Sequence, residues 1–223
     1  MSYKWWLILA TFLFGVGLIS GLALPVRTAE FMAEDVAALE ELAGYLASLP
    51  QPLVLVIILL KNISAILISF VLSPVLCLVP VLALMVNGWL LGFISALVIE
   101  EQSLGFLLGG LLPHGIFELP AFIMGEAAAL SFGAMVMVLL VRHGWSLLTS
   151  FIRKGGIRIL LILVLLTIVG IFPSIIILAL LNERTRPIVI GNLKQNLRYL
   201  LIALILLVPA AIIETYVTPL FLG

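Results

Sequence analysis

Residues 104–120 read LGFLLGGLLPHGIFELP, and this stretch decides which helices the middle of the chain can form. Its first part, residues 104–112, is apolar and contains three glycines. A helix needs about 20 apolar residues to cross a hydrocarbon core of about 30 Å, so this part is too short to cross. The sequence therefore predicts a short re-entrant or half-membrane helix here. A longer helix, interrupted by Pro120, is expected to follow over roughly residues 116–141.

Apolar runs of membrane-spanning length recur on both sides of this stretch. Of the 223 residues, 64% are hydrophobic and 10% are charged, and the mean hydropathy is +1.37. A soluble domain carries roughly 25% charged residues, so the composition excludes a soluble protein. Long apolar runs without alternation indicate helices rather than barrel strands, because backbone groups in lipid must be satisfied internally. The sequence thus predicts an all-α, polytopic transmembrane helical bundle whose surroundings are the lipid bilayer.

About six long helices are predicted in this bundle. They cover roughly residues 5–24, 53–72, 79–99, 116–141, 159–181 and 199–217. With the short helix at 104–112, they are expected to form a single integral membrane domain over residues 1–223. Basic loops precede and follow the fifth long helix, so these loops are expected to face opposite sides of the membrane. The positive-inside rule then gives only a weak preference for a cytoplasmic N-terminus.

One extended polar segment interrupts the apolar runs, at about residues 26–51. Its apolar residues recur at helical spacing, which predicts an amphipathic helix outside the membrane that begins near Thr28 and ends before Pro50. Two interpretations stay open: the helix lies on the protein's own surface or the lipid headgroups, or it binds a partner protein. Its acidic residues are Glu30, Glu34, Asp35, Glu40 and Glu41.

Two polar residues, Lys61 and Asn62, fall at the middle of the second long helix. A charge at that depth costs roughly 2.5–3.5 kcal/mol on insertion scales, so Lys61 is expected to be buried against an acceptor. Glu118 and Glu126 on the central helix are the first candidates, and Glu214 on the last helix is a further one. Whether Lys61 forms a structural ion pair or serves transport or binding is left open by the sequence.

His114 and Glu118 are four residues apart and share one helix face if Pro113 occupies the first helical turn. Such a pair can bind a metal ion or relay protons. Two ligands do not make a metal site, so no metal is predicted. The favoured interpretation is a packing role, in which these side chains satisfy the backbone groups that the helix break frees.

Several classes of function are excluded by what the chain lacks. Its formal net charge is zero, which provides no field that would attract nucleic acid. One cysteine, Cys77, and two histidines, His114 and His143, exclude cysteine-rich and multi-histidine metal sites, but not a mixed site of histidine and carboxylates. No serine nucleophile elbow, P-loop or dinucleotide fingerprint is visible. The sequence therefore predicts no cofactor and no catalytic residue.

Pairs of glycines four residues apart recur in the apolar runs. In membrane helices such pairs allow two backbones to approach closely, so these positions are predicted to be helix contacts. The pairs are Gly17 with Gly21, Gly88 with Gly92, and Gly105 with Gly109.

The central stretch also resembles the signature of a known family. The run Gly110–Ala121, continued by Gly125–Ala128, is similar to the signature segment of the stage II sporulation protein M family. Pro113, Gly115 and Pro120 are the structural residues of this motif.

Further resemblances cover most of the chain from about residue 55, so residues 53–217 form the family-like helical core. At Glu126 and Ala129 the chain departs from the pattern, because the family tends to show small residues and glycine there. The other segments that resemble the family are Lys61–Asn62, Asn87–Gly88 with Gly92, and residues 210–219 around Glu214. Asn87 is, like the other polar residues named above, a candidate buried polar residue.

The resemblance implies a multi-pass protein of the cell membrane. In spore-forming bacteria the family member is a scaffold for a peptidoglycan-degrading complex, and its partners carry out the hydrolysis. The function expected first is therefore a non-catalytic scaffold for other membrane or envelope proteins, with a homo-oligomer also considered. The alternative is a transporter or channel for an ion or small solute that uses Lys61, His114 and Glu118. An intramembrane metalloenzyme is the least favoured hypothesis.

Overall fold

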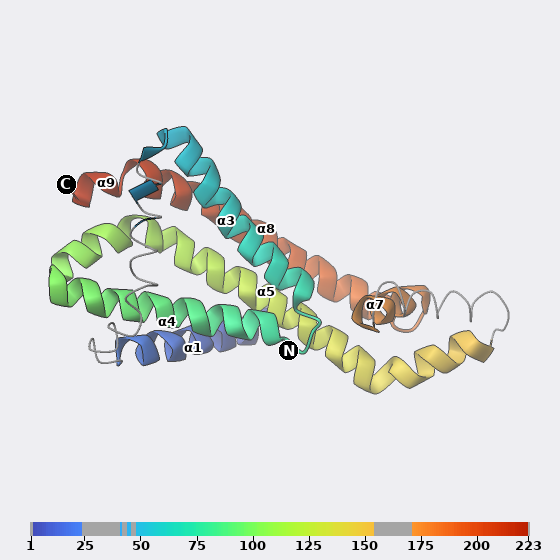
Figure 1. The fold of residues 1–223 in the computed structure, drawn as a ribbon. Helices are drawn as coiled ribbons and strands as arrows, with labels where there is room; N and C mark the ends of the chain where they lie inside the picture. Colours follow the sequence, from blue (N-terminus) through green and yellow to red (C-terminus); the bar gives the residue numbers. More distant parts are fainter. Residues whose placement is uncertain (1, 24–40, 42–43, 46–47, 154–170, 223) are drawn as a thin grey trace.

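The computed structural model describes residues 2–23, 41, 44–45, 48–153 and 171–222, and their regular structure is entirely helical (Figure 1). Five of these helices are long and apolar enough to cross a membrane, including residues 104–143 of α5. The predicted all-α polytopic bundle is therefore confirmed. The helices are α1 (Tyr3–Leu22), α3 (Gln51–Leu72), α4 (Leu78–Glu101), α5 (Leu104–Arg153), α7 (Ile171–Leu181), α8 (Arg186–Tyr216) and α9 (Pro219–Leu222).

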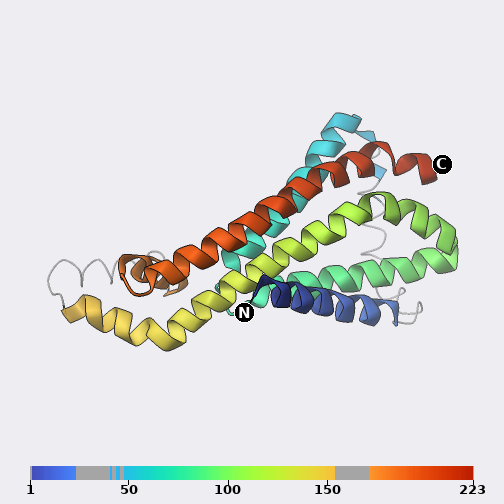
Figure 2. The same ribbon diagram turned by 180° about the vertical axis from the view of Figure 1, so that it is seen from behind.

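The long helices run in two opposite directions. Helices α1, α4 and α8 point one way, and α3 and α5 point the other way (Figures 1 and 2). We call the end where α1 and α8 begin the amino end of the bundle. The opposite end, where α1, α4 and α8 finish, is the carboxyl end. The connection between α4 and α5 and the short helix α9 both lie at the carboxyl end.

Helix α5 corrects the prediction for the middle of the chain. Residues 104–112 do not form a separate half-membrane helix, because α5 is continuous over 50 residues with Pro113 and Pro120 inside it. Each proline removes a single backbone donor, and a membrane helix tolerates this by bending. Both views show α5 as a bent rod rather than two helices (Figures 1 and 2).

The two basic loops on either side of the fifth predicted helix were expected to face opposite sides of the membrane. In the structure, the described residues next to both loops lie at the same end of the bundle. The C-terminal part of α5 and the start of α8 lie together at the amino end, and α7 contacts both (Figures 1 and 2). Of the predicted helix 159–181, the structure describes the last 11 residues, as helix α7. The rest of the predicted helix 159–181, and most of the acidic segment 26–51, lie outside the described residues.

Helices α1 and α4 pack in parallel through glycines on both partners, as predicted. A Cβ atom at any of these four glycines would meet a backbone carbonyl of the other helix at a distance that real Cβ atoms do not reach. Such close backbone approach replaces the hydrophobic driving force that is missing between helices in lipid. The contacts are Gly17 with Met85, Gly21 with Trp89, Gly88 with Phe14, and Gly92 with Leu18.

In the third predicted glycine pair, Gly105 does not make such a contact. A Cβ at Gly105 would have only the hydroxyl of Ser103 within 4 Å. Gly105 lies in the first turn of α5 and is exposed. Spacing alone therefore does not identify a packing glycine.

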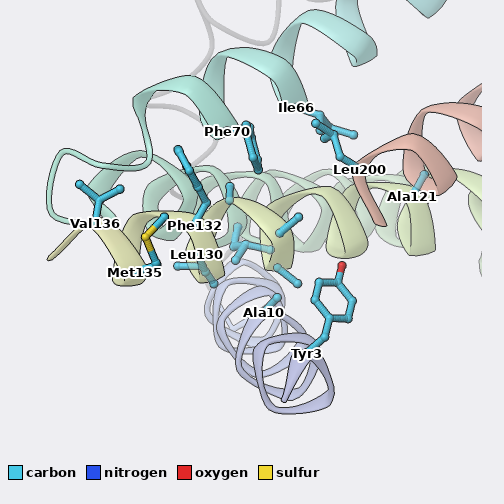
Figure 3. Packing of buried hydrophobic residues seen from close by; sticks show 14 of the residues in the cluster. Tyr3, Ala10, Ile66, Phe70, Ala121, Leu130, Phe132, Met135, Val136 and Leu200 are labelled. Atoms are coloured by element: carbon cyan, nitrogen blue, oxygen red, sulfur yellow. The ribbon is translucent and has the colours of Figure 1, made fainter. Parts of the chain in front are cut away.

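The core of the bundle is built around the middle of α5, which contacts α1, α3, α4, α7, α8 and α9. Three consecutive alanines, Ala127–Ala129, are fully buried there. On one side the ring of Phe132 stacks on Phe70 of α3, with ring centroids 4.9 Å apart. On another side Tyr3 of α1 enters the cluster (Figure 3). Small residues on α5 thus let the other helices approach it closely.

Replacing Gly88 by leucine should destabilise the bundle, because the added side chain meets the backbone of α1. Overpacking of this kind typically costs about 1–3 kcal/mol, which should lower the melting temperature by on the order of 5 °C. Gly15→Leu is the matched control, since a Cβ at Gly15 has nothing within 4 Å. Equal thermal shifts for the two variants in detergent would contradict the assigned role of the glycines.

Candidate functional site

Polar side chains from three helices meet near the carboxyl end of the bundle. We call this group the polar cluster; it consists of Asn62 of α3, His114 and Glu118 of α5, Glu214 of α8, and Thr218 in the turn before α9. His114 and Glu118 face the same side because they are one helical turn apart. Glu214 and Thr218 reach them because α8 ends at Tyr216, and α9 starts at Pro219 beside α5.

Direct contacts hold the α5 residues of the polar cluster. The Asn62 amide donates to Glu118 Oε1 at 3.0 Å, and the other carboxylate oxygen lies 3.8 Å from His114 Nε2. The second imidazole nitrogen of His114, Nδ1, lies 3.2 Å from the Thr218 hydroxyl. The side chains of His114 and Glu118 are 14% and 29% exposed. Both are therefore oriented by a neighbour and still accessible from outside the protein.

Glu214 completes the group from α8. Ligand atoms of His114, Glu118 and Glu214 all lie within 4.8 Å of one another. The sequence placed Glu214 behind Glu118 and Glu126 as a partner for Lys61; the Lys61 charge acts on Glu214, but no ion pair within 4.0 Å joins the two among the residues described. Asn62, the neighbour of Lys61, is the residue that reaches Glu118.

Two residues predicted to be buried are exposed. Lys61 is exposed and has no ion pair within 4.0 Å among the residues that the structure describes. Successive residues of a helix point about 100° apart, so Asn62 turns toward α5 while Lys61 lies outside that contact. Asn87 is also exposed, and its amide donates to the carbonyl of Ala83 at 2.7 Å within its own helix. Asn87 therefore does not belong to the polar cluster.

The predicted packing role for His114 and Glu118 is not what their contacts indicate. Pro113 and Pro120 free the carbonyls of the residues four positions earlier in α5. In the described part of the chain, His114 and Glu118 contact each other and side chains of other helices, not those carbonyls. Gly115 is buried, but a Cβ there would make only ordinary contacts with Leu111.

Glu126 forms a second polar contact between α3 and α5. It is fully buried, and Ser69 donates to its Oε2 at 2.5 Å. Its Oε1 has no hydrogen-bond partner among the described residues. The Ser69–Glu126 and Asn62–Glu118 contacts lie about two turns apart on both helices. Ser69 was missed by the sequence analysis, although its seven-residue spacing from Asn62 places both on one face of α3.

A third polar contact joins α5 to α8 and was also missed. Asn192 Nδ2 lies 3.5 Å from the Ser131 hydroxyl, and the amide of the fully buried Asn196 donates to Asn192 at 2.8 Å. Both asparagines lie in the part of α8 that precedes the predicted last span, which is why that prediction did not include them.

Ser69→Ala should lower stability, because it leaves the buried Glu126 carboxyl without its donor. The expected cost is about 1–3 kcal/mol, measurable as a lower unfolding midpoint in detergent. Ser64→Ala is the matched control, since Ser64 is exposed on the same helix. If Ser69→Ala unfolds at the same midpoint as Ser64→Ala, the hydrogen bond does not contribute to stability.

Comparison with known families gives one assignment. The family model described as stage II sporulation protein M matches residues 8–176. This match includes α1 from residue 8 onward, the glycine contacts between α1 and α4, and the α5 residues of the polar cluster. No curated protein and no solved structure matched the chain. The chain is therefore a membrane protein that belongs to the stage II sporulation protein M family.

Proposed function

We propose that this chain is a multi-pass protein of the cell membrane and acts as a non-catalytic scaffold for other membrane or envelope proteins. The observation that carries the proposal is the length of two helices. The 50 residues of α5 correspond to about 75 Å and the 31 residues of α8 to about 46 Å, whereas a hydrocarbon core is about 30 Å thick. The excess length supports a partner-binding role outside the bilayer.

The excess length is gathered at the amino end. We call it the helical extension: residues 142–153 of α5 and residues 186–198 of α8. Helix α7 packs against α5 and α8, Val189 of the extension is fully buried, and the Thr185 hydroxyl, just before α8, donates to the carbonyl of Ala179 at 2.8 Å. A packed extension offers a preformed surface, so a partner that binds it loses little conformational entropy of the scaffold.

The helical extension and its borders carry an exposed basic surface. The basic side chains of this surface have no ion pair within 4.0 Å in the ranges that the structure describes. One acidic residue, Glu183, is exposed beside them. Such charges favour acidic partners, and in loops near a membrane they favour the cytoplasmic side. The exposed basic residues are Arg142, Arg184, Arg186, Lys194 and Arg198.

We further propose that the amino end faces the cytoplasm. The carboxyl end, by contrast, carries the acidic pair Glu100–Glu101, and the acidic segment 26–51 follows α1 there in the sequence. The positive-inside rule counts Lys and Arg, and in the described part of the chain these cluster at the amino end, so the rule favours this end on the cytoplasmic side.

A cysteine-labelling experiment tests this orientation. In a Cys77→Ser background, a membrane-impermeant maleimide should label Glu101→Cys in intact cells and Arg184→Cys only after permeabilisation. Burial raises the pKa of the Cys77 thiol, so the natural cysteine should react weakly even before it is replaced. Labelling of Arg184→Cys in intact cells would reverse the proposed orientation.

Charge reversal in the helical extension tests the scaffold. Arg184→Glu combined with Arg186→Glu should reduce, by several fold, the proteins that crosslink to the chain in cells and co-purify with it. The reason is that like charges would then face the acidic partner. Glu100→Lys combined with Glu101→Lys is the matched control at the other end. Deletion of residues 28–49 tests the acidic segment as a second partner surface in the same assay.

Two outcomes would contradict the scaffold. In one, the Arg184→Glu, Arg186→Glu variant and the variant that lacks residues 28–49 both still crosslink to every partner of the wild type. The other is an ion or solute flux in liposomes that Lys61→Ala and Glu118→Ala abolish. That flux would favour transport, the second candidate, which is supported by ionisable groups of the polar cluster lying within membrane-length helices.

A further inference from the structure

The polar cluster brings three possible metal ligands together, and this observation does not depend on the scaffold proposal. His114 and Glu118 alone provide two metal ligands, which is too few for a site. Helix α8 adds a third, Glu214, and one ligand atom from each residue lies within 4.8 Å of the others. Imidazole and carboxylate together suit divalent transition metals such as zinc.

The distances are close to those that a bound ion requires. Zinc binds nitrogen and oxygen at about 2.0–2.2 Å, so two tetrahedral ligands lie about 3.4 Å apart. His114 Nε2 and Glu118 Oε2 are 3.8 Å apart, on one face of the same helix. Small side-chain rotations would close the remaining gap, and a rotation of Glu214 would bring in the third ligand from α8.

His114 and Glu118 also have the hydrogen-bond partners that metal-ligating side chains usually have. A ligating histidine usually bonds through its second ring nitrogen to another group, and ligating carboxylates are themselves hydrogen-bonded. Here Thr218 lies at His114 Nδ1 and Asn62 donates to Glu118 Oε1. Both contacts leave Nε2 and Oε2, the two atoms that face each other, as the ligating atoms.

Charge also favours a cation at this position. The carboxylates of Glu118 and Glu214 are close enough to repel each other, and the Lys61 charge opposes this repulsion at Glu214. Two carboxylates within membrane-length helices are costly unless they are neutralised. A divalent ion would neutralise both and would compete with the Lys61 ammonium for Glu214.

From this geometry we infer that His114, Glu118 and Glu214 bind one divalent transition-metal ion, with zinc as the probe. The ion links α5 to the end of α8, and Asn62 and Thr218 orient the ligands. The exposed fractions of His114 and Glu118 give the ion a path into the site.

Titration of the chelator-stripped, detergent-purified protein with zinc chloride tests the inference. The wild type should bind one ion per chain, and cobalt in its place should give a visible ligand-field absorption band. Removal of an orienting group typically weakens metal binding by about 10–100-fold, so Asn62→Ala should fall in that range. His114→Ala and Glu214→Gln remove ligands and should weaken binding by on the order of 100-fold or more. His143→Ala, which removes the other histidine, is the matched control and should bind like the wild type.

Lys61→Met distinguishes a metal site from a structural polar contact. Loss of the competing ammonium should tighten zinc binding, and a misfolded variant cannot gain affinity. The inference is overturned if the stripped wild type binds no stoichiometric zinc or cobalt. It is equally overturned if His114→Ala and His143→Ala bind with the same affinity, or if Lys61→Met binds more weakly than the wild type.

Discussion

Close backbone approach between helices is the constraint on which this structure depends. Lipid gives helices no hydrophobic reason to associate, so contact must come from fitting surfaces. Those surfaces are the buried alanines of α5 and the glycines through which the backbones of α1 and α4 contact each other. Gly125 and Gly133 do the same toward α3, where Ile66 and the carbonyl of Ser73 fill the space that a side chain would need. The polar contacts are consequences of this packing, because they form only where the backbones are near.

The parallel register of α3 and α5 explains why two polar contacts occur and not one. Asn62 and Ser69 share a face of α3, and Glu118 and Glu126 share a face of α5 at almost the same spacing. Once one contact forms, the second follows about two turns away. The Ser69–Glu126 contact is buried, whereas Glu118 of the other contact is partly exposed and lies near Glu214. Buried Glu126 thus contributes to helix packing, whereas partly exposed Glu118 is available to bind a ligand.

Local patterns predicted much of this fold. Hydropathy identified the membrane helices, spacing identified the glycines of α1 and α4, and the central motif identified His114 and Glu118. The continuity of α5 was not predictable from length rules, since Pro113 and Pro120 bend the helix without ending it. Nor could the sequence show that Glu214 joins the polar cluster, because that depends on the register between α5 and α8. The exposure of Lys61 is likewise set by how α3 is rotated against its neighbours.

The pairing of α1 with α4 has a consequence for how the protein is made. The main contact of the first helix is with the helix that ends at Glu101, and the helix between them in the sequence runs the opposite way. The ribosome must therefore release about 65 further residues after Leu22 before Gly17 can meet Met85 and Gly21 can meet Trp89. During that interval the first helix must reside in the membrane without its glycine contacts to α4.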